Sequence, residues 1–118
     1  MGSDNVQSLA TPIHSTSVAT ATDFFATDLS PHAKTGSISL LAIGVSVAAA
    51  CKVGLMISNG TTEIGPIYFN AGTDLVANAL YTFSYPMAAG YTYNLRHDDA
   101  GSITVNSCVV NEIIGPDA

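Results

Sequence analysis

Charged side chains are scarce in this sequence, and basic ones are rarer still. Lys and Arg together number 3 and Asp and Glu number 9, so 10% of the 118 residues are charged and the net charge is −6. A typical soluble domain is about 25% charged, and those charges keep its surface from associating. The 12 Ser, 12 Thr, 7 Asn and 16 Ala of this chain indicate a surface that other protein covers.

The shortage of basic residues excludes two classes of partner. The basic side chains are Lys34, Lys52 and Arg96, too few and too scattered to neutralise a nucleic-acid backbone or to bind an anionic membrane. Trp is absent as well, which weakens a sugar-stacking site without excluding one, since Tyr also stacks. We therefore expect no nucleic-acid partner and no membrane partner.

A long apolar run in the first half of the chain has two interpretations. Residues 38–57 carry one charge, Lys52, and are long enough to span a bilayer as a helix. However, the odd positions from Leu41 to Ile57 are all apolar, whereas the even positions are mostly small or polar. This period of two is typical of half-buried strands. One strand of that length would exceed the domain, so we expect two, with a bend near residues 48–50.

The same alternation continues to the end of the chain. It covers residues 75–87, 91–96 and 103–110, and Gly-containing turn sequences such as Asn59-Gly60 separate the segments. Several short strands with this spacing are typical of an antiparallel sandwich. We predict an all-β, jelly-roll-like sandwich of roughly seven or eight strands.

The N-terminal part differs from the rest in composition. Residues 1–16 alternate poorly and hold three large apolar residues, Val6, Leu9 and Ile13. Three side chains cannot offset the backbone entropy lost by ordering such a segment. We predict an extended arm over residues 1–16, which contacts neighbouring subunits, and a single sandwich domain over residues 17–118.

Residue patterns for catalysis or metal binding are weak. The three histidines lack metal-ligand spacing, and neither a nucleophile elbow nor a phosphate loop is found. His97, Asp98 and Asp99 are adjacent, which suits either a low-affinity ligand loop or, more simply, a polar turn. We predict no enzyme activity, no cofactor and no metal.

The cysteines and the aromatic residues each leave an alternative open. Cys51 and Cys108 fall in strand patterns, as buried free thiols or as an inter-sheet disulfide. The aromatic residues of the second half form either a ligand platform or the core and an interface. Among them Tyr68 has the opposite parity from Ile67 and Phe69, so we expect it to be exposed at an interface.

Residues 61–113 resemble small β-sandwich virion proteins of tailed bacteriophages, including head-decoration proteins and jelly-roll modules of tail fibres. The resemblance is carried by the acid-poor strand set, the run A-G-Y-T-Y-N-L-R and the closing run V-V-N-E-I. It implies a homotrimer or a capsid-bound subunit whose partner is the major capsid protein or another virion protein.

Two functions follow as hypotheses. The first is a capsid decoration protein on the virion exterior, made in the host cytoplasm, since residues 1–10 lack the basic region of a signal peptide. The second is a receptor- or carbohydrate-binding module of a tail fibre or surface appendage, supported by the tyrosines and by the loop of residues 97–101.

Overall fold

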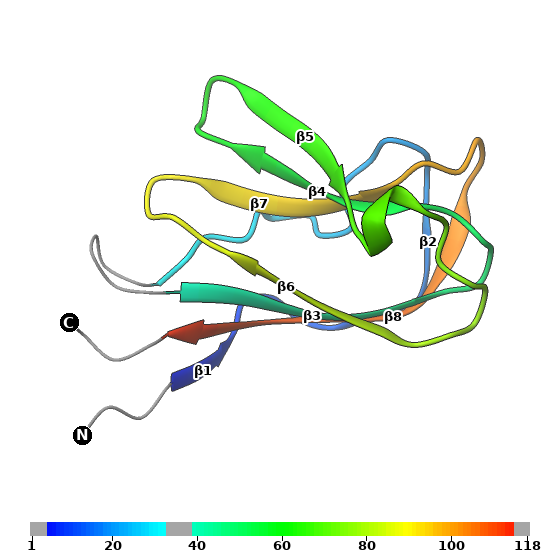
Figure 1. The fold of residues 1–118 in the computed structure, drawn as a ribbon, viewed down its shortest axis with the longest axis horizontal. Helices are drawn as coiled ribbons and strands as arrows, with labels where there is room; N and C mark the ends of the chain where they lie inside the picture. Colours follow the sequence, from blue (N-terminus) through cyan, green and yellow to red (C-terminus); the bar gives the residue numbers. More distant parts are fainter. Residues whose placement is uncertain (1–4, 33–38, 115–118) are drawn as a thin grey trace.

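Two antiparallel sheets make up the protein (Figure 1). The computed structural model describes residues 5–32 and 39–114. Its strands are β1 (Asn5–Ser8), β2 (Ile13–Val18), β3 (Ser39–Val47), β4 (Val53–Ser58), β5 (Glu63–Tyr68), β6 (Tyr81–Pro86), β7 (Thr92–His97) and β8 (Ile103–Ile114). One 3₁₀ turn, η1 (Asn70–Gly72), follows β5. The predicted all-β sandwich is confirmed.

The strands are divided unequally between the two layers. Sheet A has the order β1-β8-β3-β6, and β2 also pairs with β8, beyond the end of β1. Sheet B has the order β5-β4-β7. In Figure 1, sheet B forms the upper layer and sheet A the lower layer. The segment of residues 24–29 lies along β7, where the amide groups of Phe24 and Leu29 donate to the carbonyls of Leu95 and Tyr93.

The pairing of the strands is nested, as in a jelly roll. With residues 24–29 counted as a strand, the sequence order is β2, 24–29, β3, β4, β5, β6, β7, β8. The first pairs with the last, the second with the seventh, the third with the sixth and the fourth with the fifth. This is the folding of one long hairpin onto itself, which produces the two Greek keys of a jelly roll.

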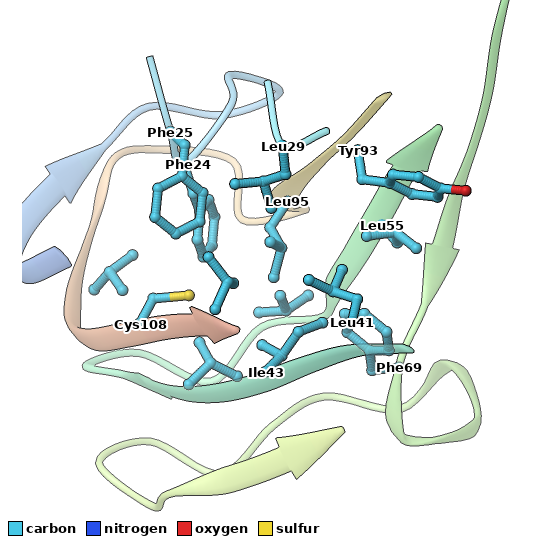
Figure 2. Packing of buried hydrophobic residues seen from close by; sticks show 14 of the residues in the cluster. Phe24, Phe25, Leu29, Leu41, Ile43, Leu55, Phe69, Tyr93, Leu95 and Cys108 are labelled. Carbon is cyan, nitrogen blue, oxygen red and sulfur yellow. The ribbon is translucent and has the colours of Figure 1, made fainter. Parts of the chain in front are cut away.

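The core lies between the sheets and follows the period of two in the sequence. Leu41, Ile43, Val45 and Val47 of β3 are at most 2% exposed, because alternate side chains of a strand point to the same face. In Figure 2, Leu41 and Ile43 of sheet A meet Leu55 and Leu95 of sheet B, and Phe24, Phe25 and Leu29 fill one end. The apolar run of residues 38–57 is thus divided between β3 and β4, and the expected bend at residues 48–50 is confirmed.

The N-terminal segment corrects the predicted arm. Residues 5–8 pair with residues 111–114, and residues 13–18 pair with residues 103–108, both within this chain's own sheet. A boundary at residue 16 would divide β2. The free energy that the side chains lacked comes from backbone pairing with β8, which needs no apolar residues. Residues 1–4 lie outside the described residues.

Truncation tests how much each N-terminal strand contributes. Deleting residues 2–8 removes β1, whose Val6 is 65% exposed, and we expect a loss of about 1 kcal/mol or less. Deleting residues 2–18 also removes β2 and the buried Val18, whose carbonyl accepts a hydrogen bond from His97. We expect that loss to reach at least about 3 kcal/mol. Urea unfolding measures both, and equal losses would contradict this division.

Candidate functional site

The outer face of sheet A carries no charged side chain among the described residues. Eleven residues of β1, β3, β6 and β8 form three rows of this face, which cross the strands according to their register: Val6, Ile113, Leu40 and Pro86; Ser8, Asn111, Ala42 and Ser84; Val109, Gly44 and Thr82. A further row, His14, Ser107 and Ser46, continues the face at β2. The first row is wholly apolar. All eleven residues are exposed or half-buried, so water reaches an apolar row and two further rows that are uncharged.

A shallow depression lies near the centre of this outer face. Its volume is about 270 Å³, and its lining includes Ala42, Gly44, Thr82, Val109 and Asn111. A Cβ atom added to Gly44 would meet nothing within 4 Å, so the depression exists because the residues at its floor are small. A side chain of a docked protein can enter there.

The charged residues lie elsewhere in the described parts of the chain. They are Asp23, Asp28, Lys52, Glu63, Asp74, Arg96, Asp98, Asp99 and Glu112. Arg96 of β7 joins two of them: its Nε atom lies 2.8 Å from Asp23 Oδ1 and its Nη2 atom 3.3 Å from Glu63 Oε2. The hydrogen bond that Arg96 donates to Asp23 raises the pKa of Arg96 above its usual value. Sheet B is therefore the layer whose exterior carries charge.

The outside of sheet B is also partly covered by its own chain. The Asn94 side chain is buried and accepts a hydrogen bond from the Phe25 amide, while it donates to the Phe25 carbonyl and to Asp28 Oδ1. These contacts fasten residues 25–28 over β7. The two faces of the sandwich therefore differ, and sheet A has the face suited to a partner, because protein interfaces are depleted of charge at their centre.

The four residues predicted to lie at an interface do not share one surface. Val6 belongs to the apolar row of the outer face, whereas Leu9 and Ile13 are half-buried against the chain's own core. Tyr68 is half-buried on sheet B, where its ring packs above Gly54 and 5.9 Å from Lys52 Nζ. Of the four, Val6 lies beside other exposed or half-buried apolar residues, those of the row Ile113, Leu40 and Pro86, so that one partner can cover them together.

The predicted ligand loop is held by hydrogen bonds within the chain. His97 is 3% exposed; its Nε2 lies 2.8 Å from the Val18 carbonyl, and its Nδ1 accepts from the Asp99 amide at 3.1 Å. Asp98 Oδ1 accepts from the Lys52 amide, and Asp99 Oδ2 accepts from the Gly101 amide. This geometry matches the simpler alternative, a polar turn. The described residues contain no cluster of metal-binding side chains.

A buried carboxylate that the sequence analysis missed lies on the inner side of sheet A. Glu112 of β8 is 0% exposed. Its Oε2 accepts a hydrogen bond from Ser39 Oγ at 2.6 Å, and both of its oxygens lie within 2.9 Å of the His32 amide. His32 Nδ1 is 2.8 Å from Oε1. Glu112 thereby anchors the chain at His32 to β8 and to the start of β3. The sequence held one signal of its burial: Glu112 follows the buried Cys108 and Val110 at alternate positions of the same strand.

The cysteines are free and buried, which decides between the two alternatives in the sequence. Burial raises the pKa of Cys108 to about 12. Burial raises that of Cys51 to about 11, with further contributions from Asp98, Asp99 and Asp74. Both groups are neutral thiols at physiological pH, so neither is a ready nucleophile.

An apolar groove opens between the sheets, beside the end of β6. Its volume is about 380 Å³, and its lining includes Ile57, Ile64, Tyr85, Met87, Tyr91 and Tyr93. The Tyr93 hydroxyl is already used, since it accepts a hydrogen bond from the Ala88 amide at 2.8 Å. Elsewhere the aromatic rings stack on one another. The ring centroids of Phe69 and Phe83 are 4.6 Å apart, and those of Tyr81 and Phe83 are 5.9 Å apart. Of the two alternatives for the aromatic residues, the core accounts for most of them: Phe69 and Tyr93 are buried in it, and Tyr81, Phe83 and Tyr85 pack against it.

Comparisons with known proteins give distant likenesses. No family model matches the sequence, and no curated protein matches it. The structure is similar to the K3 cleaved adhesin domain of Lys-gingipain from Porphyromonas gingivalis W83, with 16% identity and a TM-score of 0.41 over 80% of this chain and 69% of that chain.

The structure is also similar to a pentameric capsid protein isolated from metagenomic phage sequences. Two structures of such a protein each give 13% identity and a TM-score of 0.33 over 93% of this chain. The match spans 62% and 63% of those chains. These neighbours are β-rich, and at such distance the likeness carries no argument about function. No helix in the described parts of the chain is long and apolar enough to cross a membrane.

Replacing Glu112 tests its role as an anchor. We expect Glu112→Gln to lower the free energy of unfolding by about 2–4 kcal/mol, because an amide nitrogen would face the His32 amide or the Ser39 hydroxyl in place of an acceptor. Glu63→Gln is the matched control, since Glu63 is exposed, and we expect a change of about 0.5 kcal/mol or less. Urea unfolding of both variants gives the comparison, and losses of equal size would contradict an anchoring role.

The thiols predict a dependence of stability on alkaline pH. Unfolded thiols ionise near pH 9, while the folded thiols stay neutral up to their raised pKa values. Ionisation then favours the unfolded chain, so this contribution to stability is complete below pH 9 and is lost as the pH rises towards 11 and 12. Urea unfolding between pH 8 and 11 should show a steeper fall for the natural chain than for Cys51→Ala/Cys108→Ala. If the free energy of unfolding falls equally steeply with pH in both proteins, the raised pKa values of the two thiols are contradicted.

Proposed function

We propose that this chain is a non-enzymatic structural protein of a virion, which attaches to the exterior of the capsid through the outer face of sheet A. Its partner in this proposal is the major capsid protein or another virion protein. The observation that carries the proposal is the separation of charge: nine charged residues are described, and none of them belongs to that face.

The physical argument starts from the cost of the exposed surface. A face with the apolar row Val6, Ile113, Leu40 and Pro86 gains free energy when a partner removes it from water. A standard interface covers about 800 Å² on each partner, which is the scale of one side of a small sandwich. Because the second and third rows include Ser8, Asn111, Ser84 and Thr82, hydrogen bonds can fix the orientation of the partner.

Attachment of this kind needs no reaction. A subunit placed across a junction between capsid proteins stabilises the shell by burying area on both sides of the junction, and several such subunits add their effects. The resemblance to small virion proteins of tailed bacteriophages supports the same role. The synthesis in the host cytoplasm that was expected from the sequence remains part of this proposal, whereas attachment through this face does not require the expected homotrimer.

Charge placed on the outer face should abolish attachment. We expect Val109→Asp to weaken co-sedimentation with empty capsids of the virus that encodes the chain by at least about tenfold, because an unpaired carboxylate would be desolvated in the contact. Thr61→Asp, in the exposed turn between β4 and β5, is the control and should bind as the natural chain does. Binding that survives Val109→Asp, or is lost equally in both variants, would contradict docking through this face.

The groove near Tyr85 and Tyr91 favours the second candidate, a receptor- or carbohydrate-binding module. Tyrosine rings can stack on a sugar or a peptide, and their hydroxyl groups can set its orientation. Tyr91→Ala discriminates between the two functions, since it removes a wall of the groove and leaves the outer face of sheet A unchanged. Loss of binding to host cells with capsid attachment retained would favour the module.

A further inference from the structure

The four outer strand edges of the sandwich differ in how well they are protected. Residues 24–29 cover β7. The β5 strand carries Pro66, begins at Glu63 and has an irregular register with β4. In sheet A, the edge opposite β6 consists of β1 and β2. Strand β1 has only four residues, and Ser15 of β2 has a positive φ of 47°. Such features prevent pairing between sheet edges.

The β6 edge has one such feature, Pro86 at its last position. Its six residues, Tyr81–Pro86, carry no charge and pair with β3 without a shift in register. No described strand pairs with its other side. The sequence Tyr-Thr-Phe-Ser-Tyr combines aromatic residues and Thr, which favour strands. Proline comes last, where its missing N–H group disturbs the strand least.

The direction of the free backbone groups follows from one hydrogen bond. The Met87 amide donates to the Ser39 carbonyl at 3.0 Å. In an antiparallel pair, the residues that bond to the neighbouring strand alternate with those that face away. The odd residues of β6 therefore bond to β3, and the backbone N–H and C=O groups of Thr82 and Ser84 point away from the sheet.

The side chains of this edge form a palindrome about Phe83. Reading outward in either direction gives a small hydroxyl residue, Thr82 or Ser84, and then a tyrosine, Tyr81 or Tyr85. A strand with this symmetry is complementary to a second copy of itself in the antiparallel orientation, because each position then meets a residue of its own kind.

We propose that two copies of this chain associate through their β6 edges about a twofold axis at Phe83. In this register Thr82 faces Ser84 of the second copy, and the two residues exchange both backbone hydrogen bonds. Tyr81 faces Tyr85 of the second copy, and the two Phe83 rings face each other. Cross-strand aromatic pairs of this kind stabilise antiparallel sheets. This contact is independent of attachment to a capsid.

The apolar surroundings of β6 fit the same contact. Leu80 is 70% exposed, and the twofold register places it against Pro86 of the second copy. Tyr81, Phe83 and Tyr85 are each half-buried, so part of each side chain remains accessible to a second copy. The association would cover all of these surfaces together.

Electrostatics permit contact between identical copies at this edge. Each copy has a net charge of −6, so two copies repel one another wherever carboxylates meet. The β6 strand brings none into the contact. Since a twofold contact uses the same patch on both copies, it closes at two, and it joins the two A sheets and their uncharged outer faces into one surface.

Charged substitutions test both the edge and its register. We expect the natural chain to dimerise in sedimentation equilibrium. Thr82→Lys/Ser84→Lys and Thr82→Glu/Ser84→Glu should each dissociate at least about tenfold more readily, because like charges then face each other in both pairs. An equimolar mixture of these two variants should recover the dimer mass, since opposite charges now meet, and salt should weaken that recovery.

The controls are the same charge pairs at Thr61 and Thr62, in the exposed turn after β4, which should leave the dimer unchanged. Hydrogen exchange of the natural chain needs no substitution: the Thr82 and Ser84 amides should become protected as the concentration rises into the dimeric range. A monomer at every concentration, a trimer, a dimer that both charged β6 variants retain, or concentration-independent exchange at these amides would overturn the contact.

Discussion

The pairing of β8 with three other strands is the constraint on which the rest of the structure depends. Strand β8 takes β3 along one side and, along the other, β1 and β2 in succession. Its twelve residues bring the beginning, the middle and the end of the chain into one sheet. Because the paired strands are far apart in sequence, bringing them together costs the entropy of closing long loops. The strand pairs and the core beneath them therefore form together, and the strand pairs are not stable without the core. Glu112 adds a buried anchor at the point where β8 meets β3 and the chain at His32.

This arrangement explains why the two faces of the sandwich differ. On the outer side of sheet B, the Asn94 side chain is hydrogen-bonded to Phe25 of the chain's own segment at residues 25–28. Arg96 forms ion pairs with Asp23 and Glu63 on the same sheet. The three rows of sheet A that include Val6, Ser8 and Val109 are exposed or half-buried throughout. Among the described residues, the charged side chains of Asp23, Asp28, Glu63 and Arg96 lie on or beside sheet B. The three rows of sheet A keep small and apolar side chains without charge, which suit contact with other protein.

Much of the fold could be predicted from the sequence, whereas the sites could not. The alternation from Leu41 to Ile57 identified two strands and their bend, because period two reports one buried face whatever the partner is. Val6 was expected at an interface and lies on the uncharged face, but Leu9 and Ile13 turned inwards. The anchor at Glu112 could not be predicted. Its position points into the core, where a carboxylate is unfavourable, and its hydrogen-bond partners Ser39 and His32 are far from it in the sequence. The free state of Cys51 and Cys108 likewise needed the three-dimensional structure.

By itself the sequence determined the class of fold, the positions of most strands and the shortage of charge, because these depend on local alternation, turn residues and composition. Only the tertiary structure decided that the N-terminal segment joins its own sheet, that the charges gather away from one face, and that β6 is left as an open edge. Those outcomes depend on which strands become neighbours. Backbone hydrogen bonds between strands are the same for nearly every residue type, so the identity of a strand's partner leaves little trace in the sequence of either strand.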